Sequence, residues 1–485
     1  NCNKMKRVVT FIKSDLFILT MGKIIQMLLL FLAVRLFTKY LSDAEIGNLI
    51  LILAVTMFFG LALVNPVGSY VTRELNQWYL NGSVLSKFVI FSGYILLVSV
   101  IAFGAPYFLA LFGVGTSINT LSFSIVVSLF VFFNTWNQTI IPSLNLLFHR
   151  KAFVAFTILT VSLYLLLASV FVLLIEPTAY WWLMGQVSGL ALGFISAFIY
   201  MFLGPLKNQN NLEIGFELKE LGKVIRFAMP LSIATLFLWI LGNAYKLIIE
   251  GQIDSEALAY IGLALILSTS LAGSIESLLM QVFHSPFYKG LSSSNSIKDR
   301  TLVFQRFVDG ALPIMAGSLF VLICSASFLL TLLVDPRFSV VYQFLMFGLL
   351  IEFFRVAANI VSHVAHSEYK TAQNIKPYFY GALVATIGIF IAVKSSQWEY
   401  GVIASLLIAW FSTLAIMVRS AKRLIPFVLP IKAMLRVIVY LSPVGLLSVL
   451  FSSNSDSLIF SSSFIVLVGL YSSVILYRQY ARGIE

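Results

Sequence analysis

The chain has 485 residues, of which 60% are hydrophobic and 11% are charged, with a formal net charge of +12 and a mean hydropathy of +0.96. A soluble protein of this length could not bury so many apolar side chains, because its surface-to-volume ratio would leave too many of them exposed to water. The composition therefore excludes the soluble classes and predicts a chain dissolved largely in lipid.

Apolar runs of roughly 20 residues, the length that a helix needs to cross a bilayer, fill almost the whole chain. They predict an all-α polytopic membrane protein with about 14 transmembrane helices. In chain order we expect these at 15–37, 46–70, 87–112, 119–146, 153–175, 180–205, 224–249, 257–282, 303–333, 340–365, 376–395, 398–420, 431–452 and 458–478.

The predicted helices divide into two six-helix lobes and a C-terminal pair. We expect an N-lobe at 1–205, a cytoplasmic linker at 206–223, a C-lobe at 224–424, and the last two helices with a cytoplasmic tail at 425–485. A shift of 211 residues suggests that the lobes are parallel pseudo-repeats. It places Arg35 on Lys246, Asp43 on Asp254 and Glu45 on Glu256, and both aspartates are expected to cap the helix that follows.

The lysines and arginines indicate the orientation, because these residues accumulate in cytoplasmic loops. If the N-terminus is cytoplasmic, most of the 32 positive residues fall inside. Both termini are then cytoplasmic in a multi-pass arrangement, and the charge of +12 needs no nucleic-acid partner to explain it. The positive residues that fall outside are Arg35, Lys39, Lys246, Arg337 and Lys394.

The sequence contains none of the common catalytic, nucleotide-binding or metal-binding motifs. It has no phosphate-binding loop, no His-Glu-x-x-His, no Gly-x-Ser-x-Gly and no cysteine cluster with zinc spacing. The predicted outside loops are also too short to hold a catalytic domain. We therefore expect a transporter without a cofactor or resident metal rather than an enzyme; a membrane glycosyltransferase or acyltransferase is the alternative of a different class.

Ionisable side chains inside predicted spans are the candidate functional groups, because burying them in lipid is costly. The span at 340–365 carries a polar stripe on one helix face: Glu352, Arg355, Asn359, His363 and His366. The guanidinium of Arg355 suits a diphosphate, since it offers a planar fork of donors. The alternative is that Glu352 and Arg355 merely neutralise each other between helices.

Lys23, one turn from Gln26, lies near the middle of the first span. Together with Arg355 in the other lobe it is expected to clamp an anionic headgroup, the alternative being that Lys23 extends to the membrane surface. Trp239 and Asn243 share a face on which a sugar could stack and bond.

Three further groups are candidate coupling-ion sites: Glu276, Asp309 and His363. Glu276 is expected to be a lone membrane carboxylate among serines, with a helix-end role as the alternative. Glycines repeat every four residues at Gly185, Gly189 and Gly193, which predicts close helix packing inside the first lobe.

The segment Arg35-Leu-Phe-Thr-Lys-Tyr-Leu-Ser-Asp-Ala-Glu-Ile-Gly47, followed by an apolar helix that ends in Val71-Thr-Arg73-Glu74, resembles the N-terminal signature of Wzx-type polysaccharide flippases. His149-Arg150-Lys151 before the fifth span extends the resemblance. These are members of the multidrug/oligosaccharidyl-lipid/polysaccharide exporter superfamily.

The resemblance implies a protein of the bacterial inner membrane that works by alternating access of its two lobes. It would flip undecaprenyl-diphosphate-linked oligosaccharide units of O-antigen or a related surface polysaccharide, as in lipopolysaccharide biosynthesis, from the cytoplasmic to the outer leaflet. It also implies the membrane lipid and the polysaccharide polymerase and chain-length machinery as partners. A cation-coupled multidrug or small-molecule antiporter of the same superfamily, which usually has twelve spans, and a peptidoglycan-precursor flippase are the alternatives.

Overall fold

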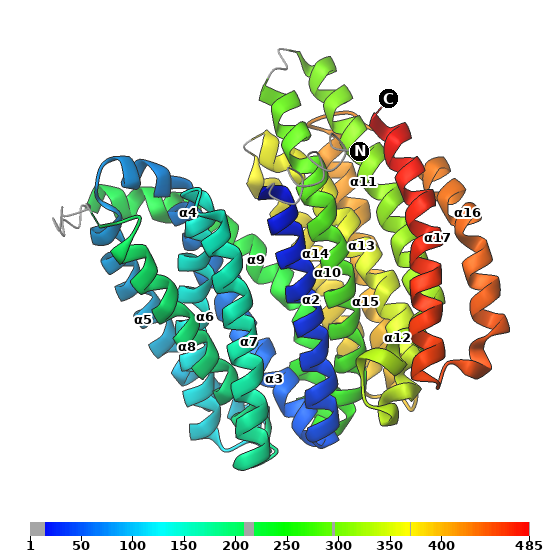
Figure 1. Cartoon of the computed structure of the whole chain (residues 1–485), viewed down its shortest axis with the longest axis horizontal. Helices are drawn as coiled ribbons and strands as arrows, with labels where there is room; N and C mark the ends of the chain where they lie inside the picture. The colour runs from blue at the N-terminus through cyan, green and yellow to red at the C-terminus, as the bar shows by residue number, and fades with distance from the viewer. Residues whose placement is uncertain (1–14, 208–217, 293–295, 369, 485) are drawn as a thin grey trace, which may run out of the picture. The chain divides into compact units, whose positions relative to one another are not determined.

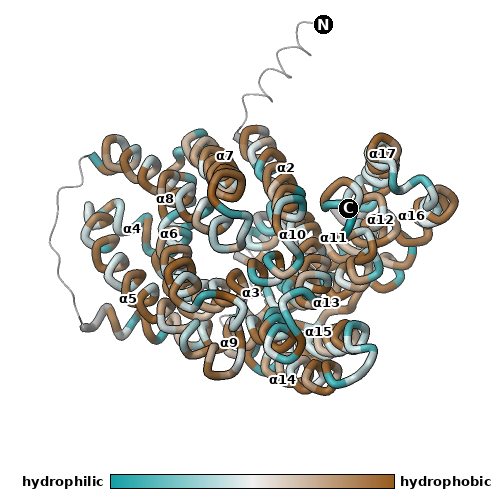
Figure 2. Tube along the Cα trace, turned by 90° about the horizontal axis from the view of Figure 1, so that it is seen from below, coloured by the Kyte–Doolittle hydropathy of each residue, from teal (hydrophilic) through white to brown (hydrophobic). Residues whose placement is uncertain are grey.

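The computed structural model of the chain describes residues 15–207, 218–292, 296–368 and 370–484. In these ranges the regular elements are all helices, and 14 helical segments are long and apolar enough to cross a membrane. Figure 1 shows the helices, and Figure 2 shows that hydrophobic residues dominate most of their length. The prediction of an all-α protein with about 14 transmembrane helices is confirmed.

The fold separates into two compact units, residues 1–236 and 237–485. In the first unit, α7 packs against α2, α6 and α8, and α6 packs in turn against α3, α5 and α8. Helix α9 (Leu218–Gln252) continues through the boundary between the units. Most of the predicted linker 206–223 lies outside the described residues. The helices of the first unit are α2 (Asp15–Tyr40), α3 (Asp43–Phe59), η1 (Gly60–Val64), α4 (Asn65–Leu80), α5 (Val84–Ala110), α6 (Thr120–Leu146), α7 (Arg150–Leu174) and α8 (Ala179–Leu203).

The second unit is built around α13, which packs against α10, α11 and α15. The α14–α15 pair lies on one side of this core, while α16 and α17 pack on α11 (Figure 1). Its helices are α10 (Ser255–Ser292), α11 (Ile297–Cys324), α12 (Ala326–Leu333), η2 (Pro336–Val341), α13 (Tyr342–Ser367), η3 (Thr371–Asn374), α14 (Ile375–Ala392), α15 (Trp398–Lys422), α16 (Ile431–Leu450), η4 (Ser452–Asn454) and α17 (Leu458–Ile484).

The two units repeat the same pattern of neighbours. The pairs α7–α8, α5–α6, α6–α8 and α3–α6 of the first unit correspond in chain order to α14–α15, α11–α13, α13–α15 and α10–α13 of the second. Five spans of the first unit thus have neighbours that correspond in chain order to those of five spans in the second, whereas the close packing of α2 on α7 is not repeated between α9 and α14. The division into two six-helix lobes with a C-terminal pair stays a prediction.

The N-termini of α10 and α3 are each capped by a side-chain oxygen. The carboxylate of Asp254 accepts a hydrogen bond of 2.7 Å from the backbone N–H of Ala257, so its predicted capping role is confirmed. At the equivalent position in the first unit, Ser42 is the N-cap and accepts from the N–H of Glu45 at 3.3 Å. Asp43 is instead the first residue of the helix, because the neighbouring serine already meets the need for an acceptor.

The second span differs from the expected helix at 46–70, since α3, η1 and α4 form one helical segment over Asp43–Leu80. Its middle is a π-helix at Gly60–Val64, directly before Asn65 and Pro66. Proline removes a backbone donor, so carbonyls in the preceding turn lose their usual partner. The hydroxyl of Tyr94 on α5 donates to the carbonyl of Leu63 at 2.8 Å and compensates at this point.

Replacing Tyr94 with phenylalanine is expected to destabilise the protein by about 1 kcal/mol, since the hydrogen bond to the Leu63 carbonyl is lost while the ring packing remains. Thermal unfolding of the purified protein in detergent measures the effect. Tyr107→Phe is the matched control, because Tyr107 is an exposed tyrosine of the same helix. An equal response of both variants would contradict the bracing role of Tyr94.

The predicted close packing of the glycine stripe is confirmed on α8. A Cβ on Gly185 would overlap the backbone of Ala168, one on Gly189 the backbone of Tyr164, and one on Gly193 the side chain of Thr160. As the residue number on α8 rises by four, the number of the contacting residue on α7 falls by four. The two helices are therefore antiparallel and lie in backbone contact along two turns.

The ninth span is not the continuous helix predicted at 303–333. Helix α11 ends at Cys324, and Ser325 links it to the short helix α12. The backbone of Ser325 leaves the helical region, with φ of −95° and ψ of 11°. Hydropathy could not reveal this break, because the apolar residues continue on both sides of it.

Candidate functional site

Helices α10 and α13 pack side by side in the second unit and bring most of the predicted polar residues together. Both run in the same direction, so contacting residues keep a nearly constant separation along the chain. Glu276 accepts a hydrogen bond from Arg355, and the ring of His284 contacts that of His363; the residues of each pair are 79 positions apart in the sequence. The polar stripe of α13 therefore faces α10, within the protein, rather than lipid.

A network of charged and polar side chains joins the two helices near their middle. The Arg355 guanidinium donates through Nε to Glu352 Oε2 at 2.5 Å and through Nη2 to Glu276 Oε2 at 2.9 Å. Asn359 Nδ2 donates to Glu276 Oε1 at 2.5 Å, and Thr269 Oγ1 donates to Glu352 Oε1 at 2.9 Å. We call these five residues the arginine network.

The charged side chains of the arginine network are largely buried. The side chains of Glu352 and Glu276 are 7% and 11% exposed, and that of Arg355 is 23% exposed. Two carboxylates share one guanidinium, so the fully ionised network carries one excess negative charge. Such a group is stable in a low-dielectric interior only while its charges remain paired and hydrogen-bonded.

The prediction that Glu276 is a lone carboxylate is wrong. It accepts from both Arg355 and Asn359, which reach it from α13. The sequence around Glu276 shows only serines and apolar residues, because its partners come from a helix far along the chain. Glu352 and Arg355 do form the expected ion pair at 2.5 Å, but they do not neutralise only each other, because Arg355 also binds Glu276.

Several residues of this region carry no specific signal in the sequence. Thr269, for example, lies on a helix face rich in serine and threonine. Tyr245 of α9 and Tyr378 of α14 are buried near the arginine network. Tyrosines are common in membrane helices, and only the packing of α13 shows which of them approach these charges.

His284 of α10 and His363 and His366 of α13 lie close together, nearer the C-terminal ends of the two helices. The ring of His363 lies 5.2 Å from that of His284 and 5.9 Å from that of His366, measured between centroids. The ring of Phe307 on α11 lies 6.0 Å from that of His363, in an edge-to-face arrangement. The described residues contain no group of histidine, cysteine, aspartate or glutamate side chains that fits a metal ion.

The other predicted site residues lie outside the arginine network. Lys23 is half-buried on α2 and donates to Gln26 at 3.4 Å, next to the contact of Gly22 with Val154. Trp239 and Asn243 are both 8% exposed, and Asn243 accepts a 2.8 Å bond from Lys246. Lys23 belongs to the first unit and Arg355 to the second.

Asp309 on α11 serves a contact with the segment that joins α15 to α16. It accepts a 2.8 Å hydrogen bond from Gln305 Nε2, which also donates to the carbonyl of Val428 at 2.9 Å. The N–H of Val428 donates back to Gln305 Oε1 at 2.9 Å. This arrangement fixes the connecting segment on α11.

Solved structures share this fold. The chain matches a lipid II flippase, MurJ, in an inward closed conformation with a TM-score of 0.68 and 15% identity, over 97% of this chain and 99% of that one. It matches an inward-facing multidrug resistance MATE transporter of the MOP superfamily with a TM-score of 0.59 and 12% identity, over 85% and 98%.

A MATE protein in the bent conformation matches with a TM-score of 0.54 and 12% identity, over 90% of this chain and 97% of that one. No protein-family model matches the chain, and no curated protein does. At these identities the likeness concerns the fold. The chain therefore has the fold of the transporters and flippases of the MOP superfamily, a multi-pass membrane architecture.

Proposed function

We propose that the protein flips undecaprenyl-diphosphate-linked oligosaccharide units, of O-antigen or a related surface polysaccharide, to the outer leaflet of a bacterial inner membrane. The observation that carries the proposal is the match to a lipid flippase over nearly the whole of both chains. That match covers 97% of this chain, whereas the two MATE matches cover 85% and 90% of it.

The resemblance of the first two spans to Wzx-type flippases supports an oligosaccharide as the cargo. Arg355 and Lys23 supply the cations for a diphosphate, one in each unit. Because Arg355 is bound to two carboxylates at rest, a diphosphate would have to replace Glu276 or Glu352 on the guanidinium. The released carboxylate could then take up a proton or cation, which would link substrate binding to the charge of the arginine network.

Complementation tests this proposal. In a bacterium whose own O-unit flippase is deleted, the wild-type chain is expected to restore surface polysaccharide, while Lys23→Ala and Arg355→Ala fail at matched membrane expression. Arg419→Ala is the control, since it removes an exposed cation of α15 outside the arginine network. Rescue by both site variants would contradict the role of the two cations.

The alternatives predict different outcomes in parallel strains. A peptidoglycan-precursor flippase, favoured by the name of the MurJ match, would rescue a strain depleted of its lipid II flippase. A cation-coupled multidrug antiporter, favoured by the MATE matches, would lower drug accumulation without restoring polysaccharide. Either result without O-unit rescue would overturn the proposed cargo.

A further inference from the structure

Helices α16 and α17 form an antiparallel hairpin at the edge of the second unit, packed on α11 (Figure 1). The side of the hairpin that is turned away from the unit is apolar and exposed. Val439 is 65% exposed, Leu446 67%, Leu470 67% and Val474 53%. In a chain that crosses the membrane, such a surface is in contact with lipid.

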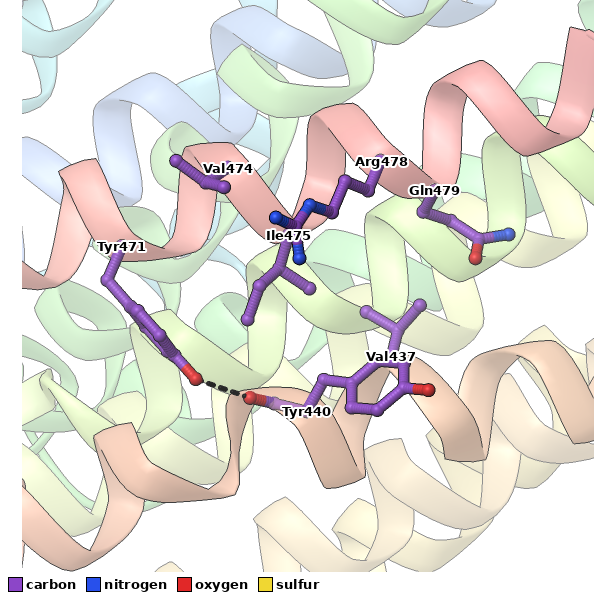
Figure 3. Close-up of a pocket in the computed structure, with 7 residues that line it drawn as sticks. All are labelled: Val437, Tyr440, Tyr471, Val474, Ile475, Arg478 and Gln479. Carbon is purple, nitrogen blue, oxygen red and sulfur yellow. Dashed lines mark hydrogen bonds between the residues drawn. The ribbon is translucent and has the colours of Figure 1, made fainter.

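A cavity of about 390 Å³ lies between the two helices of this hairpin. Its size falls at the lower end of the range of small-ligand sites. Figure 3 shows the guanidinium of Arg478 and the side chain of Ile475 in the space between α17 and α16, with the ring of Tyr440 beside them. The hydroxyl of Tyr471 donates to the backbone carbonyl of Tyr440 at 2.8 Å and ties the helices together there.

This hydrogen bond also fixes which residues of the two helices stand at the same height. With Tyr471 level with Tyr440, antiparallel helices place Arg478 about level with residue 433. Arg436 and Lys432 then lie within about 5 Å of Arg478 along the helix axis, at a rise of 1.5 Å per residue. Three cations thus lie at about the same height along the two helices, and one of them, Arg478, lines the cavity.

Among the described residues of the hairpin, no acidic side chain lies at the end that carries these cations. Between residues 431 and 484 the sequence has one acidic residue, Asp456, which lies in the connection at the opposite end of the two helices. Among the described residues, none of the ion pairs involves Arg478. The cavity therefore has an apolar, lipid-facing wall and a positively charged rim near one end of both spans.

We propose that this cavity binds one anionic membrane phospholipid, a phosphatidylglycerol-type lipid that is retained rather than transported. Its phosphate bonds to Arg478 at the rim, and the amide of Gln479 and the hydroxyl of Tyr440 are further donors there. Its acyl chains lie along the exposed apolar residues of α16 and α17. Basic pockets between transmembrane helices on the cytoplasmic side recognise anionic headgroups in this way.

The cations at this end of the hairpin are among those from which the cytoplasmic side is predicted, and on that side anionic lipid attracts lysine and arginine. A zwitterionic lipid has no net charge to complement three cations. An isoprenoid diphosphate shares the phosphate chemistry, so the experiment has to separate the membrane phospholipid from the proposed cargo.

Native mass spectrometry of the full-length protein, titrated with phosphatidylglycerol or phosphatidylcholine in detergent, tests the proposal. The wild type is expected to retain one phosphatidylglycerol in preference to phosphatidylcholine. Arg478→Gln should weaken its binding about tenfold, as expected when a charge-assisted hydrogen bond is lost. Val474→Trp, which fills the cavity from its lipid-facing wall, should weaken it while all cations remain.

Arg419→Gln is the matched control, because it removes an exposed positive charge from α15 and leaves the cavity unchanged. Equal retention of the two lipids by the wild type would overturn the proposal, as would undiminished phosphatidylglycerol binding in both cavity variants. Displacement of phosphatidylglycerol by an equimolar amount of undecaprenyl diphosphate would also overturn it, since the cavity would then belong to the proposed cargo.

Discussion

Replacing Arg355 with methionine is expected to destabilise the protein by about 3–5 kcal/mol, the range measured when one partner of a buried ion pair is removed. The carboxylates of Glu276 and Glu352 would remain 11% and 7% exposed without their shared cation. Thermal unfolding in detergent, together with the yield of folded protein, measures the effect.

A charge-free version of the same network separates stability from transport. The triple variant Glu276→Gln, Glu352→Gln and Arg355→Met removes all three charges and keeps similar side-chain volumes, so most of the lost stability should return. Its transport should stay low if Arg355 binds the diphosphate. Normal flipping by a stable triple variant would assign the arginine network a structural role alone.

The control for this series is Arg73→Met in the first unit. Arg73 pairs with Glu74 at 3.8 Å and its side chain is 64% exposed, so its loss should change stability by less than about 1 kcal/mol. If Arg355→Met were no more destabilising than Arg73→Met, the buried pairing in the second unit would not contribute to stability.

Gly189→Ala is expected to have the second large effect. The added Cβ would overlap the Cα and N atoms of Tyr164, and a backbone cannot rotate away as a side chain can. Helices α7 and α8 would have to separate, with a loss of about 1–3 kcal/mol or more, as for overpacked cores. Thermal unfolding and disulfide cross-linking of cysteines introduced on both helices measure the stability and the separation.

Two other glycines calibrate this result. Gly93→Ala on α5 meets no atom within 4 Å and should be neutral or slightly stabilising. Gly22→Ala meets the side chain of Val154 at 2.5 Å, which can shift to another rotamer, so an intermediate effect is expected. A wild-type unfolding temperature for Gly189→Ala would contradict the backbone contact between α7 and α8.

The sequence was sufficient to predict the helical fold, because crossing a membrane requires long apolar runs whose ends are marked by charge. The close packing at Gly185 and Gly189 was also predictable, since four-residue spacing places both on one face. The break at Ser325 and the π-helix at Gly60–Val64 were not predictable. Both occur inside apolar runs, where hydropathy does not change.

The sequence predicts which polar residues share one face of α13, but it does not predict which residues of a second helix they contact. The spacing of Glu352, Arg355 and Asn359 placed them on a common face, but the identity of the facing helix depends on tertiary packing. Glu276 was therefore expected to be unpaired, whereas it holds Arg355 at 2.9 Å. The roles of Lys23 and Arg355 in binding a diphosphate stay predictions.

The π-helix of the second span has a consequence for how this segment tolerates insertions and deletions. A π-turn accommodates one residue more than an α-turn, so removing a residue from Gly60–Val64 would restore an uninterrupted α-helix. Because the π-turn absorbs the extra residue, the residues that follow would keep nearly the same orientation about the helix axis. Val71 and Leu75 would then remain in the core that they share with Trp136 of α6. This segment is therefore expected to tolerate the loss of one residue at the π-turn, whereas a deletion in its α-helical parts would turn the following residues by about 100°.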